Sequence, residues 1–330
     1  MTIQKKRILS GMRPTGKLHL GNYIGALNNW VKLQDSYDCF YMVADWHALT
    51  SDYADTKNIL PNINDMVIDW LAAGLDPEKS TIFIQSSVLQ HAELHLILSM
   101  LTPLSWLERC PTYKDQLQEI QEKDLSTYGF LGYPCLQAAD IMVYKAHAVP
   151  VGEDQLPHIE FAREIARRAN NYYGEIFPEP QALLTASPKL PGIDGRKMSK
   201  SYNNCIFLSD DEHTVKNKIN QMFTDPKKIR KNDPGHPEGC VVFAFHKIYS
   251  TGIPELEQTC KSGELGCVDC KKKLLDVLDG FLNPVRKRRE ELLSQKGLVD
   301  KVLAAGNKKA NEIAELTMKE LRKNIGFKIL

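Results

Sequence analysis

The chain has 330 residues, of which 43% are hydrophobic and 25% are charged, a composition typical of globular proteins that excludes the disordered and fibrous classes. The N-terminal apolar run is too short for a signal peptide, and no stretch approaches the roughly 20 apolar residues of a membrane span, so we expect a cytoplasmic protein without a membrane segment. The formal net charge is +1, but residues 211–330 hold 23 Lys and Arg against 17 Asp and Glu, a net of +6, and the remaining 19 against 24 give −5. This asymmetry is a weak indication of a polyanionic partner for the C-terminal part, and an ordinary basic helical face explains it equally well.

Short apolar runs alternate with longer amphipathic stretches through the first 200 residues. The runs are rich in β-branched or aromatic residues and predict strands at 7–11, 39–45, 80–86 and 147–152. Apolar positions with helical spacing predict helices at 20–34, 56–73, 91–101, 131–145 and 155–173. This alternation predicts an α/β fold in which a parallel sheet has helices on its faces. Ligands of such sheets bind beyond the carboxyl ends of the strands, so the loops after the four strands should converge on one site.

Beyond residue 210 the strand signals vanish and the apolar positions follow a helical period, with a Pro- and Gly-rich loop at 224–239. Four of the eight cysteines are scattered along the chain and are expected to be small buried side chains: Cys39, Cys110, Cys135 and Cys205. The other four are clustered with the spacing C-x19-C-x6-C-x2-C: Cys240, Cys260, Cys267 and Cys270. In a cytoplasmic protein this cluster indicates metal or iron–sulfur ligation, with free thiols as the alternative.

Two polar stretches suggest phosphate chemistry. In "HLGN", residues 19–22, a turn after the first strand opens a helix, and the N–H groups of a helix N-terminus suit phosphate. His19 and Asn22 add neutral donors, and Gly21 lets a large ligand approach the backbone. In "KMSKS", residues 197–201, two lysines and two serines could clamp phosphate oxygens. Each stretch taken alone also fits an ordinary helix start or a solvated loop.

The two stretches in this order resemble the signatures of class I aminoacyl-tRNA synthetases. Together with "YPCLQAADIMVYKA" (133–146), "VPVGEDQLPHIEFAREIARR" (149–168) and "LPGIDGRKMSKS" (190–201), the chain is similar to the bacterial tryptophanyl-tRNA synthetases over essentially its whole length. The resemblance implies a Rossmann-like catalytic domain at 1–205 and a helical tRNA-binding domain at 206–330, of which a few C-terminal residues return to the first domain. It also implies a homodimer that activates L-tryptophan with ATP and Mg²⁺ and transfers it to tRNA(Trp).

The resemblance implies the residues that bind ATP. Lys197 and Lys200 would bind the departing pyrophosphate, and Lys114 would be a third lysine on the phosphates or an ordinary surface lysine. Arg13 stands where many relatives have Gln, which leaves its role open. The other expected contacts of the nucleotide are His19, Asn22, Pro14, Thr15, Gly21, Gly152, Glu153, Asp154, Leu190, Met198, Ser199 and Ser201.

A second set of residues is implied for tryptophan. Tyr133, Gln137 and Asp140 are spaced i, i+4 and i+7 and therefore share one helical face. By resemblance, Asp140 accepts the indole N–H, which is only a donor, while Tyr133 and Gln137 help hold the α-amino group. Gln155 would read the substrate amino group, and Leu9 and Ser10 would lie beside the substrate.

Two other functions remain open. A tyrosyl-tRNA synthetase shares the fold and both signatures, but usually places a second polar partner for the phenol near the first strand, where this chain has Leu9. A non-catalytic synthetase-like protein that binds tRNA typically loses signature residues, and both signatures are intact here. The cysteine pattern resembles a subset of tryptophanyl-tRNA synthetases that carry a [4Fe–4S] cluster, with Zn²⁺ as the alternative because four thiolates suit either.

Overall fold

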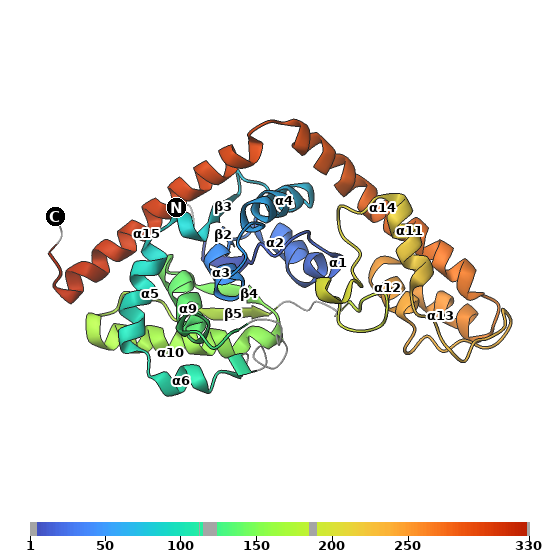
Figure 1. Ribbon diagram of the computed structural model, residues 1–330, viewed down its shortest axis with the longest axis horizontal. Helices are drawn as coiled ribbons and strands as arrows, with labels where there is room; N and C mark the ends of the chain where they lie inside the picture. The colour runs from blue at the N-terminus through green and yellow to red at the C-terminus, as the bar shows by residue number, and fades with distance from the viewer. Residues whose placement is uncertain (1–4, 112, 115–123, 185–189, 329–330) are drawn as a thin grey trace.

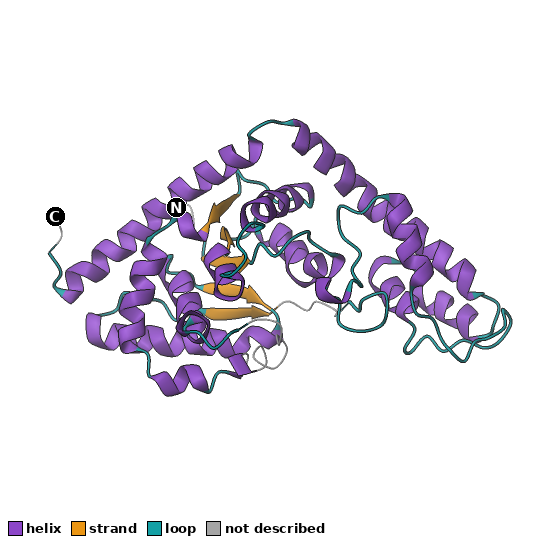
Figure 2. Ribbon diagram, in the orientation of Figure 1, coloured by secondary structure: helices purple, strands orange, loops and turns teal. Residues whose placement is uncertain are grey.

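A computed structural model describes residues 5–111, 113–114, 124–184 and 190–328. Its centre is a five-stranded sheet in the order β3-β2-β1-β4-β5 with every pair parallel (Figure 2). All four predicted strands are present and the predicted α/β class is confirmed. The strands are β1 (Arg7–Met12), β2 (Asp38–Val43), β3 (Ser80–Ile84), β4 (Ala148–Val151) and β5 (Gln181–Leu184).

The fifth strand, β5, was not predicted. Its four residues pair with β4 at the edge of the sheet and are exposed or half-buried. An edge strand of this kind lacks the apolar run that marks a buried strand in a sequence. The strand order reverses between β1 and β4, so the switch point of the sheet lies between these two strands.

Helices cover both faces of the sheet (Figure 1). The predicted helix at 20–34 is present but contains a π-helical turn at Tyr23–Leu27 between α1 and α2. The short helices α3 and α6 were not predicted, and each has too few turns to show a clear apolar period. The helices of this half are α1 (Leu20–Asn22), α2 (Asn28–Leu33), α3 (Asp45–Asp52), α4 (Ile59–Ala72), α5 (Gln90–Leu101), α6 (Leu104–Glu108), α8 (Tyr128–Leu131), α9 (Tyr133–Val143) and α10 (Leu156–Tyr173).

The part of the chain after residue 210 is helical, as predicted. Three shorter helices and the first half of α14 form a separate lobe beside the sheet domain (Figure 1). No helix among the described residues is long and apolar enough to cross a membrane. The helices are α11 (Glu212–Gln221), α12 (Val241–Tyr249), α13 (Ile253–Lys261), α14 (Cys267–Ser294) and α15 (Leu298–Ile325).

The last helix, α15, returns to the sheet and runs along β3 (Figure 1). A side chain at Gly306 could not be accommodated, because its Cβ would lie 1.8 Å from the backbone oxygen of Ile82. The side-chain oxygen of Asn307 accepts a hydrogen bond of 2.8 Å from the backbone N–H of Ile84. Ala310 and Ala314 are fully buried on the same side of the helix. The 28-residue helix α15 therefore covers the β3 edge of the sheet.

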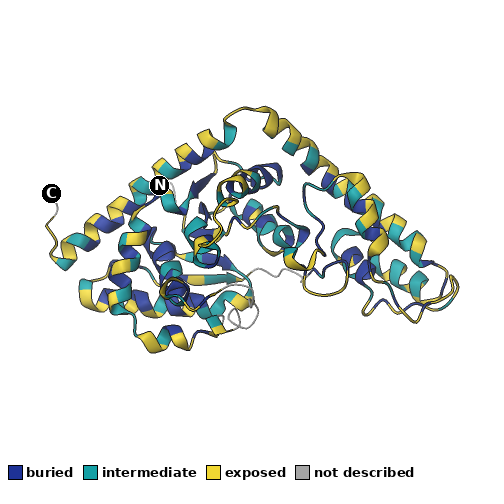
Figure 3. Ribbon diagram, in the orientation of Figure 1, coloured by how far each residue is buried: buried dark blue, intermediate teal, exposed yellow. Residues whose placement is uncertain are grey.

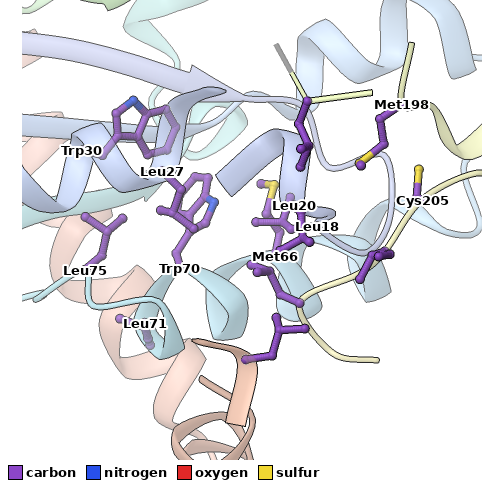
Figure 4. Packing of buried hydrophobic residues seen from close by; sticks show 14 of the residues in the cluster. Leu18, Leu20, Leu27, Trp30, Met66, Trp70, Leu71, Leu75, Met198 and Cys205 are labelled. Atoms are coloured by element: carbon purple, nitrogen blue, oxygen red, sulfur yellow. The ribbon is translucent and has the colours of Figure 1, made fainter. Parts of the chain in front are cut away.

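The "HLGN" turn and the "KMSKS" loop belong to one hydrophobic core (Figure 4). Leu18 and Leu20, on either side of His19, are buried with Met198 and Cys205 in a cluster that also contains residues of α4 and α14. Burial is concentrated around the sheet, while α14 and α15 have strongly exposed outer faces (Figure 3). The core thus places two segments that are far apart in the sequence side by side.

Helix α14 is tied to the first turn by a buried carboxylate. Asp69 of α4 is fully buried, and one of its oxygens accepts from the backbone N–H of Leu18 at 3.3 Å. The other oxygen accepts from Nε of Arg289 on α14 at 2.8 Å. Asp69 therefore bonds both Leu18, the residue before His19, and Arg289, and so links α14 to the first turn.

Candidate active site

A cavity of about 390 Å³ lies at the switch point of the sheet, within the size range of small-molecule sites. The ends of β1, β2 and β4 and the start of α9 form its walls. This confirms that the loops after these strands converge on one site. The predicted residues that line it are Leu9, Ser10, Arg13, Tyr133, Gln137, Asp140, Gly152 and Gln155.

Asp140 is the buried carboxylate of the cavity, with 1% of its surface exposed. His47, from the start of α3, lies 2.8 Å away through Nε2. Gln85, which directly follows β3, donates to both carboxylate oxygens at 2.9 and 3.0 Å. His91 of α5 lies 2.6 Å away through Nδ1. Three elements that are distant in the sequence therefore hold one carboxylate.

These partners decide the charge of Asp140. Burial by itself would raise the pKa of this carboxyl group, but hydrogen bonds from His47 and His91 and the positive charge that these rings can carry lower it to about 2. The other ring nitrogen of His91 lies 2.7 Å from the hydroxyl of Tyr144, so both nitrogens have a fixed partner. The site consequently presents an ionised acceptor at neutral pH.

Tyr133 contacts a second buried histidine. Its hydroxyl is 3.3 Å from Nε2 of His158, and Nδ1 of that ring is 3.8 Å from the sulfur of Cys110. Burial lowers the pKa of His158 to about 4, so this ring is neutral beside the cavity that it lines. The contact places an uncharged polar group next to the predicted substrate face of α9.

His19 caps the helix that starts at Leu20. Its Nδ1 accepts from the backbone N–H of Asn22 at 3.2 Å, and the side-chain oxygen of Asn22 accepts from the backbone N–H of His19 at 3.1 Å. A neutral imidazole whose Nδ1 accepts carries its proton on Nε2. Burial, and secondly the charge of Lys200, lower the pKa of His19 to about 4. His19 is thus a neutral donor, as the sequence predicted.

The "KMSKS" loop lies against the "HLGN" turn. Nζ of Lys200 donates to the backbone oxygen of Thr15 at 3.0 Å. The chain beyond the loop pairs with the first turn through a hydrogen bond from Leu20 N–H to the Ile206 oxygen and one from Leu208 N–H to the Leu18 oxygen, both 2.9 Å. Two short backbone bonds therefore fix the separation of the two signatures.

The remaining predicted ATP residues lie around the contact between the "HLGN" turn and the "KMSKS" loop or at the rim of the cavity. Lys197, Ser201, Thr15, Glu153 and Asp154 are exposed, and Gly21, Asn22, Ser199 and Lys200 are half-buried. Pro14, Leu190 and Met198 are buried. Lys114 is exposed and does not line the cavity; residues 115–123, which follow it, lie outside the described residues.

Sequence reasoning did not single out His47, Gln85 and His91. Gln85 lies near the end of the predicted strand 80–86, and His47 follows the predicted strand 39–45 by two residues. A polar side chain at the carboxyl end of a parallel strand is a signal that could have found them. His91 lies inside a helix, and nothing in its local sequence distinguishes it from a core histidine.

The four clustered cysteines line one small cavity in the C-terminal lobe, together with Asp225, Lys228 and His236. All four are free thiols, and burial raises the pKa of Cys270 to about 12. Among the residues that the structure describes, no group of three or more His, Cys, Asp or Glu side chains is arranged to hold a metal ion. The predicted cluster is therefore brought together around a cavity, without a preformed site for a single ion.

Known proteins resemble this chain over nearly its whole length. Residues 2–283 match the family described as tRNA synthetases class I (W and Y). The tryptophan–tRNA ligases of Thermotoga maritima and Aquifex aeolicus are 53% and 48% identical to it, each alignment covering 96% of this chain and 98% of the relative. A crystal structure of tryptophanyl-tRNA synthetase from Campylobacter jejuni, complexed with ADP and tryptophan, matches with a TM-score of 0.87 at 35% identity, covering 97% of this chain and 100% of that one.

Proposed function

From the premise that the chain belongs to the class I tRNA synthetases for tryptophan and tyrosine, we propose how its residues divide the work of the reaction. The chain is a tryptophan–tRNA ligase. Such an enzyme joins the amino-acid carboxylate to the α-phosphorus of ATP with release of pyrophosphate, and then transfers the acyl group to a terminal ribose hydroxyl of tRNA(Trp). Phosphoryl transfer needs little covalent help, so the protein mainly positions the reactants and neutralises charge.

The ionised Asp140 carries the proposal for the tryptophan site. Indole N–H is only a donor, so a carboxylate is its natural partner in a dry pocket. Asp140 and His47 line the cavity, whereas Gln85 and His91 hold the carboxylate from behind. Apolar side chains of Leu9, Met42 and Val149 line the same cavity and suit the faces of the indole ring. We assign Asp140 as the acceptor of the indole N–H and His47 as its neighbour on the ligand side.

The amino-acid backbone would be held by polar groups at the mouth of the cavity. Tyr133, Gln137 and Gln155 line it, and each has a side-chain oxygen that can accept from the α-ammonium. This leaves the substrate carboxylate pointing toward Arg13 and Gly152 at the rim, where the α-phosphate must arrive. The assignment makes the cavity the place of adenylate formation.

The phosphates would lie where the two signatures meet. Neutral Nε2–H of His19 and the amide of Asn22 can follow developing charge on phosphate without repelling magnesium ions. Lys197, Lys200, Ser199 and Ser201 would bind the pyrophosphate as it leaves. Lys114 would reach the phosphates from its position immediately before residues 115–123.

A pyrophosphate–ATP exchange assay with tryptophan and tyrosine side by side tests the substrate assignment. Exchange with ATP and Mg²⁺ should be stimulated by tryptophan and not by tyrosine. Stimulation by tyrosine alone would favour the sister enzyme, and no stimulation by either amino acid would favour a non-catalytic tRNA-binding protein.

We propose that the four-thiol cavity holds a [4Fe–4S] cluster, with a zinc ion as the alternative, because the cysteine pattern resembles that of the cluster-bearing synthetases and four thiolates suit either group. A single Zn²⁺ needs all four sulfurs about 2.3 Å from one point, whereas a cubane cluster contributes its own sulfides and spans thiolates that lie farther apart. Cys240, Cys260, Cys267 and Cys270 line one small cavity, which is the observation that supports a shared ligand. When bound, the cluster would cross-link loop 224–239 to α13 and α14.

Metal analysis of anaerobically purified protein tests this assignment. The protein should be brown and contain about four irons per chain, since four Cys thiolates hold one cubane cluster. Stoichiometric zinc without iron would replace the cluster by a zinc site. Protein that binds neither metal would show that the four cysteines are ordinary thiols.

The chain is proposed to be a homodimer. Large apolar side chains stand exposed along α5, just before it and at the start of α6: Leu89, Leu96, Met100 and Leu104 are 57–73% exposed. A second copy of the chain would cover this stripe. Sedimentation of the wild type and of Leu96→Lys/Met100→Lys should give a dimer and a monomer respectively. The C-terminal part of the chain, residues 211–330 with a net charge of +6, is proposed to bind tRNA(Trp) in the cytoplasm.

A further inference from the structure

The two asparagines that follow the "KMSKS" loop have different environments. Asn203 is exposed and has a left-handed backbone conformation with a φ of +50°. Asn204 is 1% exposed. A buried amide must satisfy an oxygen and two N–H groups to avoid a large desolvation cost, so its partners indicate its purpose.

The strong hydrogen bonds of the Asn204 amide all go to the segment 194–199, and the Cys205 thiol adds a weak contact of 3.9 Å to the amide oxygen. Its side-chain oxygen accepts from the backbone N–H of Ser199 at 2.8 Å. Its NH₂ group donates to the backbone oxygen of Lys197 at 3.1 Å and to Oδ1 of Asp194 at 2.8 Å. The backbone oxygen of Asn204 accepts from Ile193 N–H at 3.0 Å. One side chain therefore joins Asp194, Lys197 and Ser199.

The space for this amide is kept by a glycine. A Cβ at Gly192 would lie 2.1 Å from Nδ2 of Asn204 and 2.9 Å from its Cβ, distances that no real contact shows. Gly192 has no positive φ, so close approach, and not backbone conformation, requires glycine here. The loop is thus shaped around the asparagine.

We propose that Asn204 is the positioning residue of the signature loop, and that it presents Lys197 and Ser199 to the phosphates by bonding the backbone of both. The inference rests on the proposed phosphate role of those two residues. Asn204 itself is buried and does not line the active-site cavity. Asp194, which also accepts from the backbone N–H of Arg196 at 3.0 Å, anchors the amide from the other side.

The substitution Asn204→Asp tests the donor role because it keeps the oxygen and the size. It removes both donated bonds and puts a carboxylate against Asp194 and the Lys197 carbonyl. We expect adenylate formation, followed as pyrophosphate exchange, to fall about 10- to 100-fold, the range expected for a lost buried hydrogen bond with an unpaired partner. Tryptophan affinity, measured by calorimetry, should stay within about 2-fold because the cavity is unchanged.

The double variant Asp194→Asn/Asn204→Asp, here called the swap, distinguishes a positioning role of Asn204 from a merely structural one. In the swap, the new amide at 194 donates to the new carboxylate at 204, which restores one of the two lost bonds with its direction reversed. At least a 3-fold recovery of exchange over Asn204→Asp is expected. The swap should recover exchange even if its melting temperature stays below that of the wild type.

The Gly192→Ala variant tests the same amide by filling the space that the Asn204 side chain occupies. The new methyl must displace the Asn204 side chain, so this variant should resemble Asn204→Asp. Two matched variants control for it. Asn203→Gly keeps the left-handed turn, and Gly280→Ala adds a methyl where nothing lies within 4 Å; both should keep exchange within about 2-fold of wild type.

The results separate this inference from the proposed function. If Lys197→Ala slows exchange while Asn204→Asp and Gly192→Ala leave it within about 2-fold, the positioning role is wrong and the phosphate role stands. If Lys197→Ala leaves exchange intact, the phosphate role is wrong and the inference fails with it. An equal loss of tryptophan affinity in Asn204→Asp would overturn the inference in favour of general destabilisation.

Discussion

The Asp140 pocket and the four-thiol cavity both gather polar or ionisable groups that lie far apart in the sequence, but they differ in how the protein satisfies these groups. Asp140 is surrounded by donors from His47, Gln85 and His91, so its charge is balanced before any ligand arrives. The four thiols share a cavity with each other, and burial raises the pKa of Cys260, Cys267 and Cys270. The first site is complete within the fold, whereas in the second burial outweighs the stabilising charge of Lys228 and the thiol pKa values rise.

The elements around the two sites also differ in how well they are packed. Helix α9, which carries Asp140, is almost entirely buried between the sheet and other helices. The thiols lie at the start of α12, near the end of α13 and at the start of α14, around a Pro- and Gly-rich loop. A core of packed side chains fixes the first site. We expect a bound group to take the place of such a core in the second.

Asp140→Ala should produce the largest effect. The variant removes the proposed acceptor for the indole N–H and leaves His47, Gln85 and His91 without their common partner. We expect kcat/KM for tryptophan in exchange to fall about 10²- to 10⁴-fold and the preference for tryptophan over other amino acids to shrink. Unchanged selectivity, measured with tryptophan, tyrosine and phenylalanine, would show that α9 does not read the side chain.

Lys197→Ala and Lys200→Ala should come next. Their charge is needed mostly when pyrophosphate leaves, so each should slow adenylate formation about 10²-fold, as the loss of one electrostatic contact to the transition state does. Tryptophan affinity should hardly change. An effect confined to tryptophan binding would refute the assignment. Exposed Lys287 of α14 provides a matched lysine whose replacement should have no effect.

The Cys267→Ser variant tests the four-thiol cavity. The variant should loosen the C-terminal lobe and lower tRNA charging about 10-fold, while tryptophan-dependent exchange stays near wild type, since the loss of a ligand of the proposed cluster would weaken local structure first. Cys39→Ala, a cysteine of β2 outside the cavity, is the control. Equal losses of charging and exchange would mean that the two sites are not independent.

The smallest expected effect concerns His19. Lys200 lowers the pKa of His19 in addition to burial, so Lys200→Ala should raise that pKa from about 4, while burial keeps it below the ordinary value. Titration of the ring by NMR measures the change. In the wild type the ring should stay neutral as the pH falls from 8 to 5, because protonation occurs only near the lowered pKa. A lower or unchanged pKa in the variant would place Lys200 away from the ring.

Much of the fold followed from local patterns. The apolar runs of β1 to β4 and the helical periods after residue 210 were enough to predict the α/β class and the helical C-terminal part. Strand β5 was missed because its exposed edge position left no apolar run. The amphipathic pattern of α15 was visible, but nothing in it indicated that the whole helix would return to cover β3.

The amino-acid sequence alone predicted which residues act on phosphate, on indole and on a metal, from side-chain chemistry, short spacing and the resemblance to the class I synthetases. Only the tertiary structure decided which of them meet. Gln85 and His91 reach Asp140 because β3, α5 and α9 lie next to each other, and Asn204 reaches Ser199 because the loop folds back on Gly192. Such contacts depend on strand order and loop closure, which no local pattern encodes.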